Sequence, residues 1–423
     1  MRMIHLIEIW VVVFFFTVTI VIPAGAAGSA MMFRMNPQHT GDYGSVSGGI
    51  LPNGLQKWVF PTGTVVVSSP AVVDGVVYIG SGDGKVYAID AATGTPKWTF
   101  TTGGYVDSSP AVVSGVVYIG SGDGKVYAID AATGAQKWTF ATEDSCEPMR
   151  EASSPVVVNN AVYVKGCHLV YAIDAATGAQ KWIFTTQLSW ESWNRFSSPA
   201  VANGVVYAGG GNRLYAIDAV TGTLRWATVL PIGGPSSSPA VAEGVVYVGG
   251  YANVVAFDAA TGTQKWISWI GVCCITHPVY SSPAVVNGRV YAGTFEGKIF
   301  ALDSMTGARK WAFNTGADVR SSPAVADGVV YVGSGDDKIY ALDAVKGTRK
   351  WAVKTGGRVD SSPAIVDGVV YVGSADGKVY AIENGVVPSP TIPEFPPLFP
   401  CILLSAILAL VIVVKWRETN IFI

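Results

Sequence analysis

Eight copies of one short text run along this 423-residue chain, and that repetition limits the possible folds more than any other feature. Each copy carries Ser-Ser-Pro and a basic residue followed by Trp, 40 to 45 residues from the next copy. The prolines are Pro70, Pro110, Pro155, Pro199, Pro239, Pro283, Pro323 and Pro363. The tryptophans are Trp58, Trp98, Trp138, Trp182, Trp226, Trp266, Trp311 and Trp351. A period of this length predicts a repeat architecture rather than a set of unrelated domains.

Each repeat divides into four short strands, A to D, with glycine-containing turns between them. In the first complete repeat, strand A follows Pro70, strand B is Val76–Gly80, strand C is Lys85–Asp90 and strand D carries Trp98. Asp-Gly, Asn-Gly and Thr-Gly suit tight hairpins because glycine accepts positive φ without strain. Four antiparallel strands in about 40 residues is the period of a propeller blade. We therefore predict an all-β, eight-bladed β-propeller of four-stranded antiparallel blades.

The two ends of the repeat region complement each other. The segment Leu55–Phe60 contains Trp58 and reads as a D strand that has no blade of its own. The last repeat, Ser361–Glu383, has strands A, B and C but lacks a Trp. We expect the N-terminal D strand to pair beside Tyr380 in the last blade, which would close the ring and remove both open edges.

Composition excludes two classes of protein. Half of the residues are apolar and 14% are charged, so the chain can bury a large core and is not disordered. The 28 basic and 30 acidic residues balance, and no nucleic-acid partner is expected.

The continuously apolar stretches lie at the two termini. Residues 1–26 read as a signal peptide with an apolar core, Ile9–Ile22, although a retained anchor helix is the alternative. A lead-in segment spans 27–50, the propeller 51–384 and a Pro-rich spacer 385–397. Residues 398–417 read as a transmembrane helix with a basic end, and 418–423 as a tail. This order predicts an extracellular, surface-exposed protein that is attached to the membrane at its C-terminus.

Irregularities of the repeat fall in one kind of loop. The interval from each Ser-Ser-Pro proline to the next Trp hardly varies, whereas the D–A connections carry three insertions, Glu143–Glu151, Gln187–Phe196 and Ile270–Tyr280. D–A loops share one face of a propeller, and variable loops on a rigid scaffold commonly bind partners. Their partner-binding candidates are Trp190, Glu191, Trp193, Arg195, His277 and Tyr280. Packing of these loops on one another is the alternative.

Four of the five cysteines are candidates for disulfides. Cys146 and Cys167 lie in loops on the same face of one blade, so we expect them to pair in a secreted protein. Cys273 and Cys274 are adjacent in the third insertion. The four histidines are scattered, and no metal site is expected.

The residue before each Ser-Ser-Pro begins an innermost strand and should line the mouth of the central channel. These residues are Val67, Asp107, Ala152, Phe196, Ser236, Tyr280, Arg320 and Asp360. A ring this mixed could hold a small polar ligand, with Arg320 and Asp360 pairing across neighbouring blades. It lacks the convergent carboxylates typical of a calcium site.

The turn motif Ala-x-Asp-x-x-Thr-Gly-x-x-x-Trp resembles the repeat of the pyrroloquinoline-quinone-like (PQQ-like) propeller family. It occurs with Asp90, Thr93, Gly94 and Trp98, and again with Asp130 and Trp138. We assign these residues a structural role in joining blades. Some members of the family are quinoprotein dehydrogenases that carry a vicinal cysteine pair beside the cofactor, which makes Cys273, Cys274, Asp107, Arg320 and Asp360 the candidates for contacting a quinone. The chain lacks their long acidic insertions, so no catalytic residue is matched.

The C-terminus resembles a second known pattern. Pro393, Glu394 and Phe395, followed by an apolar helix and basic residues, are similar to the PEF-type sorting signals of archaeal surface proteins. In that family the helix is removed and replaced by a lipid; a plain membrane anchor is the alternative.

Taken together, these features favour a monomeric, cell-surface binding or scaffold module without a cofactor. Its partner would be a surface protein, a glycan or a small ligand on the D–A face. A PQQ- and calcium-dependent oxidoreductase is the second hypothesis, and an envelope protein assembly factor is the third.

Overall fold

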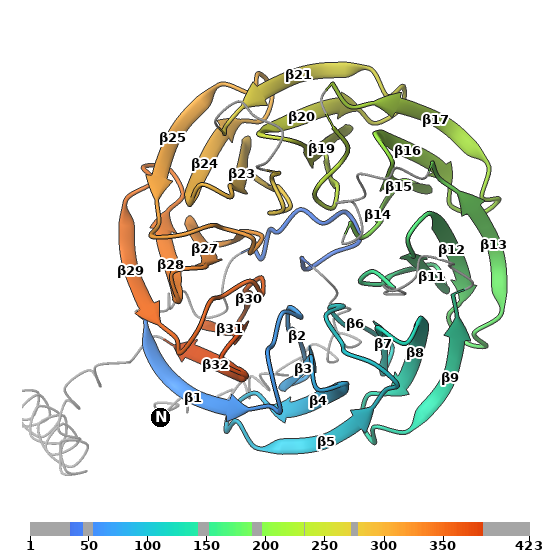
Figure 1. Cartoon of the computed structure of the whole chain (residues 1–423), viewed down its shortest axis with the longest axis vertical. Coiled ribbons are helices and arrows are strands. Elements are labelled where there is room, and N and C mark those ends of the chain that lie inside the picture. Colours follow the sequence, from blue (N-terminus) through green and yellow to red (C-terminus); the bar gives the residue numbers. More distant parts are fainter. Residues whose placement is uncertain are drawn as a thin grey trace, which may run out of the picture. The chain divides into compact units, whose positions relative to one another are not determined.

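The computed structural model describes residues 34–44, 54–142, 152–187, 197–231, 233–271 and 278–383. These residues form 32 strands in eight four-stranded antiparallel sheets, which surround a central axis like blades (Figure 1). The predicted eight-bladed propeller is therefore confirmed.

Each blade contributes one short strand to the wall of the channel. These innermost strands are β2 (Ala71–Val73), β6 (Ala111–Val113), β10 (Val156–Val158), β14 (Ala200–Ala202), β18 (Ala240–Ala242), β22 (Ala284–Val286), β26 (Ala324–Ala326) and β30 (Ala364–Val366). The second strands are β3 (Val76–Ser81), β7 (Val116–Gly120), β11 (Ala161–Lys165), β15 (Val205–Gly210), β19 (Val245–Gly249), β23 (Arg289–Gly293), β27 (Val329–Ser334) and β31 (Val369–Ser374).

The third and outermost strands complete each blade. The third strands are β4 (Lys85–Asp90), β8 (Lys125–Asp130), β12 (Leu169–Asp174), β16 (Arg213–Asp218), β20 (Asn253–Asp258), β24 (Lys298–Asp303), β28 (Lys338–Asp343) and β32 (Lys378–Glu383). The outermost are β5 (Pro96–Thr101), β9 (Gln136–Ala141), β13 (Gln180–Thr185), β17 (Leu224–Val229), β21 (Gln264–Trp269), β25 (Arg309–Asn314), β29 (Arg349–Lys354) and β1 (Leu55–Pro61). We number the blades from blade 1 (β2–β5) to blade 8 (β30–β32 with β1).

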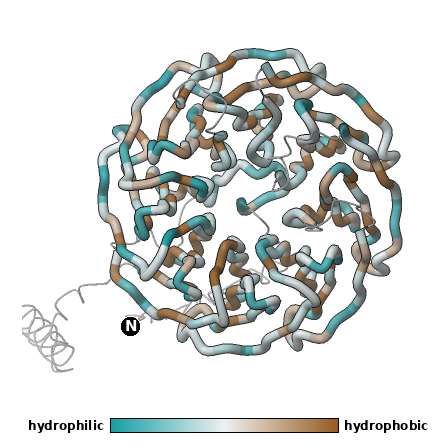
Figure 2. The backbone as a smooth tube through the Cα atoms, in the orientation of Figure 1, coloured by the Kyte–Doolittle hydropathy of each residue, from teal (hydrophilic) through white to brown (hydrophobic). Residues whose placement is uncertain are grey.

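Burial explains why the inner strands read as apolar runs. The middle residues of β4, Val86 to Ile89, are all buried because both faces of the sheet pack against neighbouring blades. The outermost strand β5 instead alternates between exposed and half-buried residues, since one of its faces meets solvent. Figure 2 shows the same division, with apolar stretches inside the blades and polar residues interrupting the rim.

The ring closes through the N-terminal strand, as predicted. β1 pairs antiparallel with β32, with Val59 opposite Tyr380 and Trp58 opposite Ala381. An ion pair of 3.1 Å between Lys57 and Glu383 lies at the edge of this pairing. Blade 8 is thus built from both ends of the repeat region.

A tryptophan joins each blade to the next. The indole Nε1 of Trp98 donates a hydrogen bond of 2.9 Å to the carbonyl of Ala131 in the following blade, and Trp58 donates one of 3.0 Å to Ala91. The Trp58 ring lies against Gly94, where a Cβ atom would come within 2.8 Å of the ring. Gly94 also has a φ of 75°, so the Thr-Gly turn needs glycine both for its backbone and for the packing of the indole.

The aspartate and threonine of the motif hold the turn that carries this glycine. The Asp90 carboxylate accepts hydrogen bonds from the backbone N–H of Thr93 and from its hydroxyl, each 3.0 Å long. Lys97 forms an ion pair of 3.2 Å with the same carboxylate. These contacts are local and recur from blade to blade, as expected for residues that shape a turn.

The lead-in segment lies inside the channel, which the sequence did not indicate. Residues 34–44 pass along the innermost strands of four successive blades (Figure 1, blue segment at the centre). Backbone N–H groups of these strands donate to carbonyls of the lead-in. The pairs are Val201 with Pro37, Val241 with Gln38, Val285 with Thr40 and Val325 with Gly41, at 2.7 to 2.8 Å. The lead-in therefore satisfies backbone groups on the otherwise unpaired inner edges of β14, β18, β22 and β26.

The predicted signal peptide, Pro-rich spacer and C-terminal helix lie outside the described residues. Within the described ranges, the structure has no helix with the length and apolarity needed to cross a bilayer.

The closure predicts a specific loss of stability. Replacing Trp58 with Ala should lower the free energy of unfolding by about 3–5 kcal/mol, because a buried indole and an inter-blade hydrogen bond are lost together. Lys57→Ala is the matched control on the same strand and should cost less than about 1 kcal/mol, since its ion pair is partly exposed. Chemical denaturation of both variants measures the difference. Equal effects would show that β1 does not close the ring.

Candidate ligand pocket on the propeller axis

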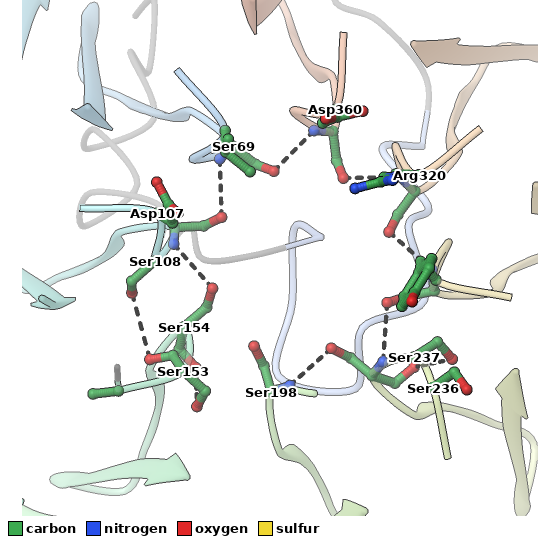
Figure 3. Close-up of a pocket in the computed structure, with 18 residues that line it drawn as sticks. Ser69, Asp107, Ser108, Ser153, Ser154, Ser198, Ser236, Ser237, Arg320 and Asp360 are labelled. Carbon is green, nitrogen blue, oxygen red and sulfur yellow. Dashed lines mark hydrogen bonds between the residues drawn. The ribbon is translucent and has the colours of Figure 1, made fainter. Parts of the chain in front are cut away.

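A cavity of about 440 Å³ opens on the axis at the end of the channel where the D–A connections lie (Figure 3). Seven of the eight residues predicted for the channel mouth line it, and the eighth, Phe196, lies outside the described residues. The seven are Val67, Asp107, Ala152, Ser236, Tyr280, Arg320 and Asp360. Most of the remaining lining comes from the serines of the Ser-Ser-Pro repeats.

Within the described residues, the first serine of every repeat except the fourth, Ser197, accepts a hydrogen bond from the second strand of its own blade. In blade 1, the Ser68 hydroxyl accepts a hydrogen bond of 3.0 Å from the backbone N–H of Gly80 on β3. The same hydroxyl donates 2.9 Å to the carbonyl of Ser108 in blade 2. Both hydrogen-bonding capacities of this side chain are therefore used inside the scaffold.

The second serines form a ring around the axis. The backbone N–H of Ser69 donates to the hydroxyl of Ser109 at 2.9 Å, and Ser109 donates in the same way to Ser154 (Figure 3). Ser362 donates to Ser69 at 2.9 Å and carries the ring across the junction of blades 8 and 1. Seven such bonds join successive blades within the described residues.

This ring leaves hydroxyl protons available to a ligand. Each accepting hydroxyl, such as that of Ser109, donates no hydrogen bond to another residue in the described part of the chain. A serine hydroxyl has one proton to donate in addition to its lone pairs. The pocket wall therefore offers a circle of hydroxyl donors to oxygen or nitrogen acceptors placed on the axis.

Asp107 supplies the complementary acceptor. Its side chain is half-buried at the pocket wall, and within the described ranges it makes no hydrogen bond or ion pair (Figure 3). Burial raises the pKa of the Asp107 carboxyl above its usual value. Tyr280, four blades further round the ring, brings an aromatic side chain to the same cavity.

The charged groups beside Tyr280 form a connected network. The guanidinium of Arg320 lies 5.6 Å from the ring centroids of both Tyr280 and Phe295. Its Nε donates 2.9 Å to Asp318, whose carboxylate also accepts 2.7 Å from Arg358.

Arg358 extends the same network to the next blade. Its Nε donates 3.0 Å to Asp360, so Arg320 and Asp360 are linked only through Asp318 and Arg358. Our prediction of a direct ion pair between Arg320 and Asp360 is wrong. Each of the two side chains instead forms an ion pair with a residue two positions away on its own loop. Among the described residues that line the pocket, Asp107 is the one charged side chain outside this network.

The remaining candidates are placed only in part. Cys167 is disulfide-bonded, while the other cysteines lie outside the described residues, so its pairing with Cys146 stays a prediction. The loop candidates Trp190, Glu191, Trp193, Arg195 and His277, and the pair Cys273 and Cys274, are likewise outside the described ranges. Sequence reasoning missed the second serines as pocket residues. Their signal was present, since they are polar residues repeated at the start of every innermost strand.

A family model described as outer membrane protein assembly factor BamB matches residues 44–182, 166–270 and 251–387. The chain belongs to this PQQ-like propeller repeat family. Among curated proteins, none matches the chain.

Solved structures share the fold at low sequence identity. BamB from Moraxella catarrhalis is 21% identical, with a TM-score of 0.63 over 78% of this chain and 99% of that one. The quinohemoprotein alcohol dehydrogenase from Comamonas testosteroni is 17% identical, with a TM-score of 0.70 over 84% of this chain and 80% of that one. The computationally designed Ika8 protein reaches a TM-score of 0.66 at 16% identity, over 78% of this chain and all of that one. Likeness at this level shows the fold alone.

The described residues of the pocket fit a quinone and calcium poorly. PQQ carries several carboxylates, which would need cationic partners. The two nearby guanidinium groups, those of Arg320 and Arg358, already form ion pairs with aspartates. Calcium binds through six to eight oxygen ligands, usually including several carboxylates. In the described part of the pocket, Asp107 is the one carboxylate that is not held by an arginine. The described residues also contain no group of three or more His, Cys, Asp or Glu side chains that could hold a metal ion. We therefore derive no reaction through these groups.

The raised pKa of Asp107 predicts how stability changes with pH. Because the folded pKa lies above the unfolded one, the native state binds more protons in the interval between them, and stability falls as pH rises through it. Asp107→Asn should therefore be more stable than the parent protein at about pH 7, and the difference should shrink towards about pH 4. Urea unfolding at both pH values measures this. The variant Asp74→Asn, in an exposed turn, controls for the loss of one carboxylate. The account would be contradicted if the parent protein were more stable than Asp107→Asn at neutral pH.

Proposed function

We propose that this protein is a binding module that takes a small, neutral, hydroxyl-rich ligand, such as the terminal sugar of a glycan, in its axial pocket. The observation that carries the proposal is the combination of a circle of serine hydroxyl donors with the carboxylate of Asp107, the one unpaired carboxylate among the described pocket residues. Sugar hydroxyls both donate and accept hydrogen bonds, so one ligand can satisfy both kinds of group.

Two further features support this class of ligand. The cavity volume, about 440 Å³, lies within the range of small-molecule sites. Tyr280 presents an aromatic side chain at the wall, which suits the apolar face of a sugar ring. A strongly anionic ligand is disfavoured, because the one unpaired charge among the described pocket residues, that of Asp107, is itself negative.

The cellular setting belongs to the same proposal. We propose that residues 1–26 direct export and that the C-terminal segment holds the protein at the outer surface. Residues 398–417 would do so as a membrane helix, or a lipid would replace that helix after processing at the PEF-type signal Pro393–Phe395. The pocket would then face a medium in which cell-surface glycans are present. Binding through the D–A loops to a surface protein, as a scaffold, is compatible with this arrangement and uses the same face.

Binding measurements test the proposal directly. Titration calorimetry with a panel of neutral monosaccharides and disaccharides should show one-to-one binding of at least one of them. Asp107→Asn should weaken that binding by about tenfold or more, because a hydrogen bond to a charged acceptor is lost. The matched control, Asp74→Asn, removes an exposed carboxylate in an A–B turn and should bind as the parent protein does.

Other outcomes would favour the other hypotheses. No binding to any sugar, or equal binding by Asp107→Asn and the parent protein, would contradict the proposal. An absorbance change on adding PQQ and calcium, with dye-linked oxidation of an alcohol, would show an oxidoreductase instead. Capture of unfolded outer-envelope proteins would support a role like the one named for the BamB family.

A further inference from the structure

A guanidinium group is buried in the channel without a partner. Arg34 is 4% exposed, and none of its three side-chain nitrogens has a hydrogen-bond partner in the described part of the chain. It also forms no ion pair within the described residues. An arginine has five N–H donors and keeps its charge at neutral pH, so this burial leaves the donors and the charge uncompensated.

The lead-in segment fixes where this group lies. A Cβ atom added to Gly41 would come within 2.8 Å of Nη2 of Arg34 and 2.9 Å of the carbonyl oxygen of Pro323. Pro323 directly follows Ser322, which lines the axial pocket. The guanidinium therefore lies inside the ring, at the depth where the innermost strands begin.

Within the described residues, no negatively charged side chain pairs with Arg34. His39 is fully buried, and burial together with the charge of Arg34 lowers the pKa of His39 to about 3. The Tyr43 hydroxyl donates 3.2 Å to the carbonyl of Pro363, so it is a neutral group held by the scaffold. The Asp42 carboxylate accepts a hydrogen bond of 2.8 Å from the backbone N–H of Gly44, and within the described residues it forms no ion pair with Arg34. Burial lowers the pKa of Arg34 itself to about 9, which still leaves it charged at neutral pH.

We propose that Arg34 binds a small oxyanion, a carboxylate, sulfate or phosphate group, within the channel beside the lead-in segment. Two oxygens of such a group match the planar fork of the guanidinium and compensate its charge at the same time. The site is separate from the carboxylate of Asp107, and the inference does not depend on the axial pocket binding a sugar.

Thermal unfolding in different salts tests the inference. With ionic strength held constant by chloride, the melting temperature of the full chain should rise with acetate, sulfate or phosphate and then saturate, by about 5 °C at high occupancy. Arg34→Met should lose the saturable part and keep only the general salt effect. Comparing acetate with sulfate and phosphate identifies which oxyanion is preferred. Arg349→Met removes an exposed arginine from β29 and should respond as the parent protein does.

The stability of the variant without added oxyanion gives a second readout. Arg34→Met should then be at least as stable as the parent protein, since it removes an uncompensated buried charge. Identical salt responses of Arg34→Met and the parent protein would overturn the inference. So would a destabilised Arg34→Met combined with no saturable response in the parent protein, because Arg34 would then be bonded to the scaffold.

Discussion

The antiparallel pairing of β1 with β32 is the contact on which the rest of the molecule depends, because a ring of blades has two open edges until its ends meet. The pairing supplies blade 8 with its outermost strand and places Trp58 against blade 1. It also brings Ser362 and Ser69 together, so the circle of serine hydrogen bonds continues across the junction. Both of these serines line the axial pocket, so the closure forms part of its wall.

The serine ring and the pocket chemistry come from different parts of each repeat. Ser-Ser-Pro is the same in every blade because its hydroxyls and N–H groups bond to the neighbouring blades, and the geometry of that bond repeats. The residue just before it faces the cavity and is free to vary, as Asp107, Tyr280 and Arg320 do. Fold similarity cannot assign a ligand here, since dehydrogenases, BamB and a designed protein all share the architecture. If the pocket binds a ligand as proposed, these varying residues would determine which ligand it takes.

The repeat made most of the fold predictable from sequence, since strand boundaries, turn glycines and the unmatched D strand all leave local signals. The channel-mouth residues were predictable for the same reason, because their position relative to Ser-Ser-Pro is constant. The lead-in was not predictable. Residues 34–44 contact blades 4, 5 and 6 through one backbone hydrogen bond each and blade 7 through three, and backbone bonds impose no side-chain pattern. The Arg320–Asp360 pair was wrong because spacing along the ring says nothing about Asp318 and Arg358, which lie closer on the same loops.

Native-state hydrogen exchange tests the closed ring most directly. If β1 closes it, the backbone amides of Ser362 and of β32 should exchange with the same opening free energy as those of Ser238 and β16, on the far side of the ring. All four would then exchange only when the whole propeller unfolds. Faster exchange of Ser362 and β32, with Ser238 and β16 still protected, would show that blade 8 opens by itself. That result would contradict the central claim that the N-terminal strand makes the propeller one cooperative unit.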